Sequence, residues 1–174
     1  MPRLWAVVAI ALAASAVTSA AVAADGKTLR LNWVDTTPSN RPAMTFKVAS
    51  VTLTPRAWSV RATIVNRSKE PAEIVRADAR AYPHQYNFAV AWFSACPPHA
   101  YSCERGINSW PSLRAAYAKP ALPKELGPGE SWSGVFGGPG LPPQGKLVYV
   151  TFGTFVFRLR GTALGWITNG SFKR

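Results

Sequence analysis

Residues 45–66 read TFKVASVTLTPRAWSVRATIVN, and this stretch decides the fold. From residue 57 on, apolar and polar residues alternate, so that one face would carry Trp58, Val60, Ala62 and Ile64. This period of two, rich in β-branched residues, is typical of a strand with one buried face. The first half also alternates but changes phase, which predicts a β-bulge near residues 49–50 or a switch between sheets. Because Pro55 and Arg56 separate the two halves, the stretch predicts a β-hairpin.

Most other patterned segments are also typical of strands, and they cover residues 29–34, 73–76, 86–93, 131–136, 146–158 and 164–168. Residues 86–93 and 146–158 are apolar on both faces, as in central strands, and Gly153 predicts a bend or bulge. Residues 73–76 are expected to form a short edge strand. One short helix is predicted at residues 112–119, SLRAAYAK, with Ser112 as its N-cap.

Seven or eight strands with Pro/Gly turns between them predict an all-β fold, an antiparallel sandwich, with a closed barrel as the alternative. The expected core consists of Trp58, Phe88, Val90, Trp92, Phe136, Val150, Phe152 and Phe155. An interior of this size is sufficient for one domain.

The first 24 of the 174 residues have the order of a secretory signal peptide. Arg3 precedes an apolar stretch, and small residues ending in Ala21-Val22-Ala23 follow it. The alternative is an uncleaved membrane anchor. Cleavage would leave one β-sandwich domain at residues 25–174 and would change the formal charge from +12 to +11. The sequence therefore predicts a secreted or extracytoplasmic protein.

Cys96 and Cys103 are the two cysteines of the chain. An even pair in an exported protein predicts a disulfide, which would close a short loop and stabilise the fold by about 2–3 kcal/mol. The rival interpretations are a metal site or a redox pair. C-x6-C is not the C-x-x-C motif, however, and only His84 and His99 could add imidazole ligands. No cofactor and no metal site are predicted.

The segments VASVTLTPRAWSVRATIVNRSKEPAEIV, ELGPGESWSGVF and GKLVYVTFGTF together resemble exported bacterial immunoglobulin-like domains. In such domains a hairpin ends in Val-Asn-x-Ser and continues into a short edge strand. Phe-Gly-x-Phe at residues 152–155 and Trp-Ile-Thr at residues 166–168 are similar to actinobacterial members of uncharacterised function. The resemblance covers residues 44–168 except for the middle loop. It implies an immunoglobulin-like sandwich but no particular activity.

Residues 94–130 form a long, proline-rich segment that contains both cysteines. Loops of this length are usually functional or disordered. Its first part, residues 94–117, is the candidate binding surface, and its side chains suited to a sugar or a peptide are His99, Tyr101, Arg105, Trp110 and Tyr117. The alternative is that Trp110 and Tyr117 form a small core under a loop that covers one end of the sandwich.

Basic residues gather between residues 56 and 80, where Arg61 is expected to point outward with Arg76 as a further cation. In an exported protein such a surface would meet anionic envelope polymers or lipid headgroups. The alternative is a solvated strand face that prevents aggregation. Nucleic acid is not an expected partner, because the chain is exported and lacks a basic-aromatic binding motif.

No catalytic motif is present, since G-x-S-x-G and paired carboxylates are both missing. The sequence therefore predicts an exported, non-enzymatic binding module at the cell envelope, whose cationic surface and disulfide loop contact anionic or glycan components. The first alternative is a protein-interaction or inhibitor domain that docks through an edge strand or the loop. A hydrolase is the second. The protein is expected to be a monomer, and to contact a membrane only if the leader is uncleaved.

Overall fold

The computed structural model describes residues 26–75, 87–92 and 111–174. Within these ranges the chain forms twelve strands and no helix: β1 (Lys27–Thr36), β2 (Met44–Thr54), β3 (Ala57–Asn66), β4 (Ala72–Val75), β5 (Ala89–Trp92), β6 (Ser112–Arg114), β7 (Tyr117–Lys119), β8 (Glu125–Leu126), β9 (Ser131–Pro139), β10 (Leu147–Phe157), β11 (Thr162–Ile167) and β12 (Phe172–Lys173). All their pairings are antiparallel. The prediction of an all-β, antiparallel fold is confirmed. The expected seven or eight strands were too few, because β6, β7, β8 and β12 are too short to give a pattern.

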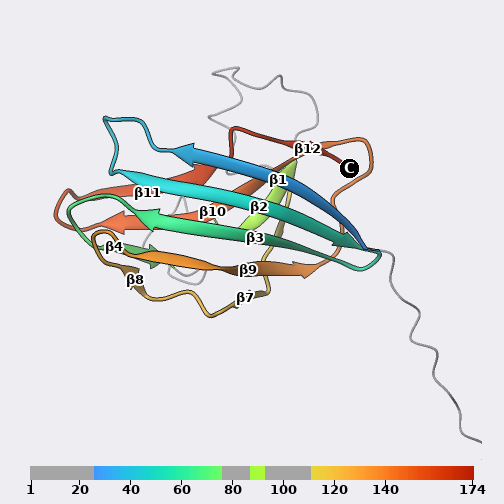
Figure 1. The fold of residues 1–174 in the computed structure, drawn as a ribbon, viewed down its shortest axis with the longest axis horizontal. Coiled ribbons are helices and arrows are strands. Elements are labelled where there is room, and N and C mark those ends of the chain that lie inside the picture. Colours follow the sequence, from blue (N-terminus) through green and yellow to red (C-terminus); the bar gives the residue numbers. More distant parts are fainter. Residues whose placement is uncertain (1–25, 76–86, 93–110) are drawn as a thin grey trace, which may run out of the picture.

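The strands form two sheets that lie one behind the other (Figure 1). The first has the order β1-β2-β3-β9-β7. In the second, β10 is central: one of its edges pairs with β5 and then β4, and the other pairs with β12 and then β11. β6 flanks β5, and β8 flanks β4. β4 is therefore not the edge strand that the sequence predicted, because it has a neighbour on each side.

Bulges adjust which side chains reach the interior. The register of β2 against β3 shifts between Val48 and Ser50, so that Val48 and Val51 are both buried despite their opposite parity. This confirms the predicted bulge. The register of β10 against β11 shifts at Gly153, where the sequence predicted a bend or bulge. Because of this shift, Phe152 and Phe155 are both buried on the same side of β10.

The interior between the sheets is rich in aromatic rings. Phe46 of β2 lies 4.9 Å from Phe152 of β10 between ring centroids. Phe136 of β9 lies 5.2 Å from Phe88, just before β5, in an edge-to-face arrangement. These contacts join the two sheets. The expected core is confirmed, except that Trp92 is only half-buried.

The predicted helix at residues 112–119 is wrong, because this segment crosses from one sheet to the other. β6 pairs with β5 in the second sheet, and β7 pairs with β9 in the first. Between them, Ala115 N donates to Phe88 O (2.7 Å) and Ala116 N donates to Gly137 O (2.8 Å). Since partners in both sheets accept these backbone hydrogen bonds, the helix propensity of the alanines is overridden.

At the edges of the two sheets that lie away from β6 and β7, the buried side chain of Asp35 joins the sheets. Asp35 Oδ2 of β1 accepts hydrogen bonds from Trp166 Nε1 of β11 (3.2 Å) and from Asn169 N (2.9 Å). Asp35 thereby ties the edge of the first sheet to the edge of the second. No helix within the described ranges is long and apolar enough to cross a membrane. The predicted signal peptide at residues 1–24 lies outside these ranges.

Candidate functional site

The outward residues of the five-stranded sheet fall into rows that cross the strands. Consecutive pairings across the five strands join, in order, Arg30 of β1, Ser50 of β2, Arg61 of β3, Val135 of β9 and Lys119 of β7. Residues paired in this way share a face of the sheet. Arg30, Arg61 and Lys119 are exposed, so this face is the outer one. We call these five residues the cation row.

The spacing of the cation row follows from the sheet. Its cations lie on the first, third and fifth strands, and neighbouring strands are about 4.8 Å apart, so the backbone positions of successive cations are about 10 Å apart. At this distance in water two like charges repel by only about 0.4 kcal/mol. Salt at physiological strength screens charges over about 8 Å. Repulsion within the cation row therefore destabilises the fold little, and each cation interacts mainly with charges that are nearer than its neighbours in the row.

Hydroxyl groups flank the cation row on one side. A second row of paired residues consists of Thr28, Thr52, Ser59, Gly137 and Tyr117, and we call it the hydroxyl row. Thr28 Oγ1 and Thr52 Oγ1 are 3.0 Å apart and hydrogen-bonded. The Tyr117 hydroxyl lies over Gly137, where a Cβ atom would come within 2.8 Å of its oxygen. Lys119 Nζ is 5.8 Å from the Tyr117 ring centroid, a cation–π contact.

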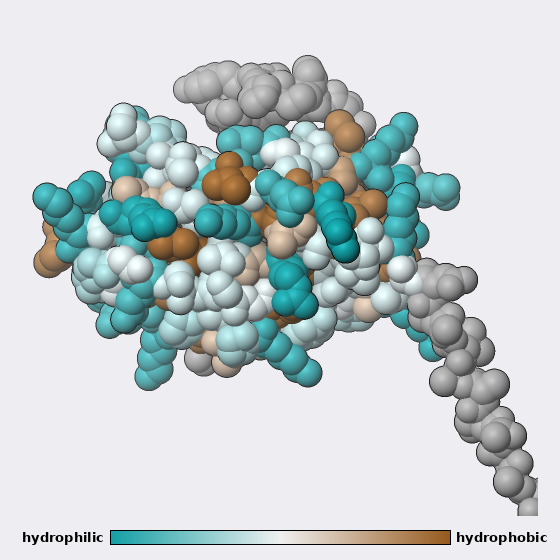
Figure 2. Space-filling view, viewed as in Figure 1, coloured by the Kyte–Doolittle hydropathy of each residue, from teal (hydrophilic) through white to brown (hydrophobic). Residues whose placement is uncertain are grey.

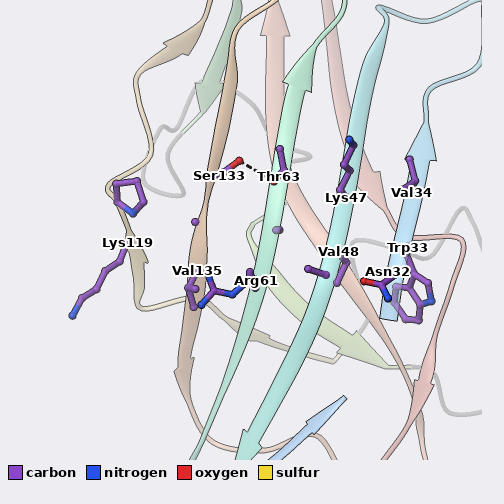
Figure 3. Close-up of a pocket in the computed structure, with 14 residues that line it drawn as sticks. Asn32, Trp33, Val34, Lys47, Val48, Arg61, Thr63, Lys119, Ser133 and Val135 are labelled. Atoms are coloured by element: carbon purple, nitrogen blue, oxygen red, sulfur yellow. Dashed lines mark hydrogen bonds between the residues drawn. The ribbon is translucent and has the colours of Figure 1, made fainter. Parts of the chain in front are cut away.

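A third row borders the other side and is made of Val34, Lys47, Thr63 and Ser133. Thr63 Oγ1 and Ser133 Oγ are hydrogen-bonded at 2.8 Å. Between this row and the cation row lies a groove of about 500 Å³, which we call the cross-strand groove. Figure 3 shows it running across the strands, with Arg61 extended from β3 toward Val135 of β9.

Two bulges shape the cross-strand groove. Its lining includes Asn32 and Ala49, which lie at the register shifts of β1 and β2. Asn32 has φ +49°, a left-handed conformation that asparagine tolerates better than most residues. The bulge in β1 was not predicted from the sequence. Each inserted residue separates the flanking rows, and bulges are frequent where a sheet carries a site.

Within the described residues, the charges of this face have no acidic partner in the sheet. Of the described acids, Asp35 points inward, Glu70 and Glu73 contact arginines elsewhere, and Glu125 and Glu130 lie outside the rows. Arg158 and Arg160, by contrast, form ion pairs. Arg158 Nε donates to Glu73 Oε2 at 2.7 Å, and Arg160 Nε lies 2.9 Å from Glu70 Oε1. No ion pair in the described part of the chain involves a residue of the cation row.

The exposed face of the sheet is mainly polar. Figure 2, viewed from the side of β1, β2 and β3, shows hydrophilic side chains spread over it, with separate hydrophobic residues between them. Such a surface is suited to hydrated, charged ligands rather than to a large apolar partner.

Two of the predicted binding residues, Arg61 and Tyr117, lie on this same face, on strands β3 and β7 that β9 separates. The prediction that Arg61 points outward is confirmed. The other predicted residues lie outside the described ranges, and they are Arg76, Cys96, His99, Tyr101, Cys103, Arg105 and Trp110. Sequence reasoning missed Arg30, Lys47 and Lys119. Arg30 and Lys47 lie in alternating segments, at positions whose side chains point to the outer face, so the pattern could have revealed them. Lys119 was assigned to the predicted helix.

The described ranges contain no cluster of three or more His, Cys, Asp or Glu residues that could hold a metal ion. Comparisons with protein-family models, curated proteins and solved structures gave no match to the chain. The residues of the site offer guanidinium and ammonium groups for anions, and hydroxyl groups for polar ligands.

Proposed function

We propose that this protein is an exported, non-enzymatic binding module that holds an anionic glycan or polymer of the cell envelope on its five-stranded sheet. The observation that carries the proposal is one sheet face bearing four exposed cations and, within the described residues, no acid. The cations are Arg30, Lys47, Arg61 and Lys119. The leader-like residues 1–24 support a location where envelope polymers are available.

The position of Arg61 argues for binding rather than for protection against aggregation. Charges that prevent aggregation act at sheet edges, but β3 is the middle strand of the five. A guanidinium group presents paired donors that fit a carboxylate or a phosphate. The neighbouring hydroxyl groups of Ser59 and Thr63 can donate to and accept from sugar hydroxyls.

We also propose that the fold is an immunoglobulin-like sandwich and that the protein is a monomer. The two antiparallel sheets that face each other across an aromatic core support the fold assignment. So does the path of residues 48–75, which form a hairpin and then a short strand in the opposite sheet.

Docking through an edge strand is less well supported. The longest edge of the first sheet is β1, and its pairing is interrupted between Arg30 and Trp33. A bulge within an edge is one of the devices that prevent pairing with another chain. The dependence of binding on salt distinguishes polymer binding from edge-strand docking, because electrostatic binding to a polymer weakens steeply as the ionic strength rises.

Replacing the central cation tests the proposal. Arg61→Glu is expected to weaken binding to polygalacturonate at low salt at least tenfold, because a carboxylate then stands in the middle of the cation row. The affinity is measured by calorimetry on the protein purified after export, first at low and then at physiological salt.

Lys173→Glu is the matched control, since it changes the net charge equally but lies on β12 of the second sheet. It should retain affinity within about twofold. If both variants lose affinity alike, net charge alone determines binding and the proposed face is wrong. Polymer binding that is absent even at low salt would overturn the function itself.

A further inference from the structure

The side chain of Tyr117 reaches across a neighbouring strand on the outer face of the first sheet. Tyr117 of β7 pairs with Gly137 of β9, which pairs in turn with Ser59 of β3. A Cβ atom on Gly137 would come within 2.8 Å of the Tyr117 hydroxyl oxygen and within 2.9 Å of Ser59 Cα. The phenol therefore occupies the space that glycine leaves open on β9, and its hydroxyl group lies beside Ser59.

The position of the Tyr117 hydroxyl is fixed by its surroundings. The backbone of β7 is held against β9, because Ala116 N donates to Gly137 O at 2.8 Å and Tyr117 pairs with the same glycine. Lys119 Nζ lies 5.8 Å from the centroid of the Tyr117 ring. A tyrosine placed in this way loses little conformational entropy when a ligand binds.

Arg61 stands next to the two hydroxyl groups. Ser59 and Arg61 point to the same face of β3 and are two residues, about 7 Å, apart along the strand. Figure 3 shows the Arg61 side chain turned from β3 toward Val135 of β9, the strand that Tyr117 crosses. The guanidinium group and the two hydroxyl groups thus gather over β9, from strands on either side of it.

The protein itself uses none of these three groups. In the part of the chain that the structure describes, the hydroxyl groups of Ser59 and Tyr117 form no hydrogen bond, and Arg61 forms no ion pair. Other hydroxyl groups of this face are hydrogen-bonded to each other in pairs. The hydroxyl groups beside Arg61 are therefore free to bind a ligand.

A cation with neighbouring hydroxyl groups distinguishes between anions that a cation alone would bind alike. A guanidinium group binds a carboxylate whatever molecule carries it. The phenol and the serine hydroxyl are uncharged and both donate and accept, so they add affinity for a ligand that has hydroxyl groups near its acid. A sugar acid has such hydroxyl groups on the ring that bears its carboxylate, whereas an acidic polypeptide side chain has none. A site that hydrogen-bonds a ligand hydroxyl discriminates against an analogue that lacks it.

We infer that Tyr117 determines specificity on this face, by adding affinity for polymers of sugar acids that other polyanions do not gain. This inference rests on the proposed function and names its ligand class. The carboxylate of one sugar binds at Arg61, and a hydroxyl group of the same sugar bonds to the hydroxyl groups of Tyr117 and Ser59 over β9.

Three polymers and one substitution test the inference. Polygalacturonate carries carboxylates and hydroxyl groups, polyglutamate carries carboxylates alone, and dextran carries hydroxyl groups alone. Tyr117→Phe removes one oxygen atom and leaves the ring and the net charge unchanged. At low salt it is expected to weaken binding to polygalacturonate at least about threefold and binding to polyglutamate less than about twofold, because only the former loses a hydrogen bond. The unaltered protein should not bind dextran measurably.

Two further variants accompany Tyr117→Phe. Ser59→Ala removes the second hydroxyl group of the site and should show the same selective loss. Ser112→Ala is the control, since it removes an exposed hydroxyl group from β6 of the second sheet. It should leave both affinities within about twofold. Circular dichroism and the thermal midpoint establish that each variant is folded.

The outcomes separate the inference from the proposed function. If Tyr117→Phe weakens binding to both acidic polymers alike, or to neither, the inference is wrong while anionic-polymer binding stands. Binding to polyglutamate alone also overturns the inference. Failure to bind either acidic polymer, or binding to dextran as tight as to polygalacturonate, overturns both. A loss confined to polygalacturonate supports both.

Discussion

Phe136→Ala is expected to lower the free energy of unfolding by about 4 kcal/mol, since truncating a buried phenylalanine leaves a large cavity. Phe136 is fully buried in β9. Its ring packs edge-to-face against Trp58 of its own sheet at 6.0 Å, against Phe88 at 5.2 Å, and near Phe152 of the opposite sheet at 6.0 Å. The loss is a large part of the 5–15 kcal/mol that stabilises an ordinary domain.

Denaturant unfolding and the thermal midpoint measure this loss, and the midpoint should fall by roughly 10 °C. Phe136→Leu keeps most of the volume and should lose less than half as much. Leu159→Ala, at a position that is 85% exposed, should change stability by less than about 0.5 kcal/mol. If Phe136→Ala is no more harmful than Leu159→Ala, the two sheets do not pack as described.

Asn66→Ala is expected to cost about 3 kcal/mol, because each buried polar group left without a partner costs about 1–3 kcal/mol. Asn66 is fully buried at the end of β3. Its Nδ2 donates to Glu70 O and to Leu126 O, both at 2.8 Å, and its Oδ1 accepts from Ser68 N and Ser68 Oγ. One side chain thus joins the turn after β3 to β8.

The same unfolding experiments compare three variants. Asn66→Asp should be at least as destabilising as Asn66→Ala, because an oxygen would face two carbonyl oxygens where an amide now donates. Asn169→Ala is the control, since Asn169 is exposed and its Nδ2 donates only a 3.3 Å hydrogen bond to Asp35. It should lose less than about 1 kcal/mol. Equal losses at the two asparagines would contradict a structural role for the Asn66 network.

The fold could be predicted where the pattern is local. Alternation in residues 57–66 gave the face of β3, and the phase change before Val51 gave the bulge of β2. The Val-Asn-x-Ser motif was recognised as the end of a hairpin, and the hydrogen bonds of Asn66 and Ser68 explain its residues. The segment at 112–119 was misassigned because its partners, Phe88 and Gly137, are far away in the sequence.

The binding face could be predicted only in part. Alternation sufficed to turn Arg61 outward, and Tyr117 was selected for its chemistry. The cation row, however, depends on the register of four strand pairs, and Arg30 meets Ser50 in a segment of β1 that ends at an unpredicted bulge. A shift of one residue in any pair would move a cation to the opposite face. Such long-range register cannot be read from one sequence.

Mapping the ligand on the protein by nuclear magnetic resonance tests most directly whether the first sheet is the binding face. Backbone amide shifts of the protein are followed while polygalacturonate oligosaccharides are added at low salt. The largest changes are expected at and beside Arg30, Arg61 and Lys119, across all five strands of the first sheet. Changes confined to the second sheet, or to the hairpin around Leu159, would contradict binding on the first sheet.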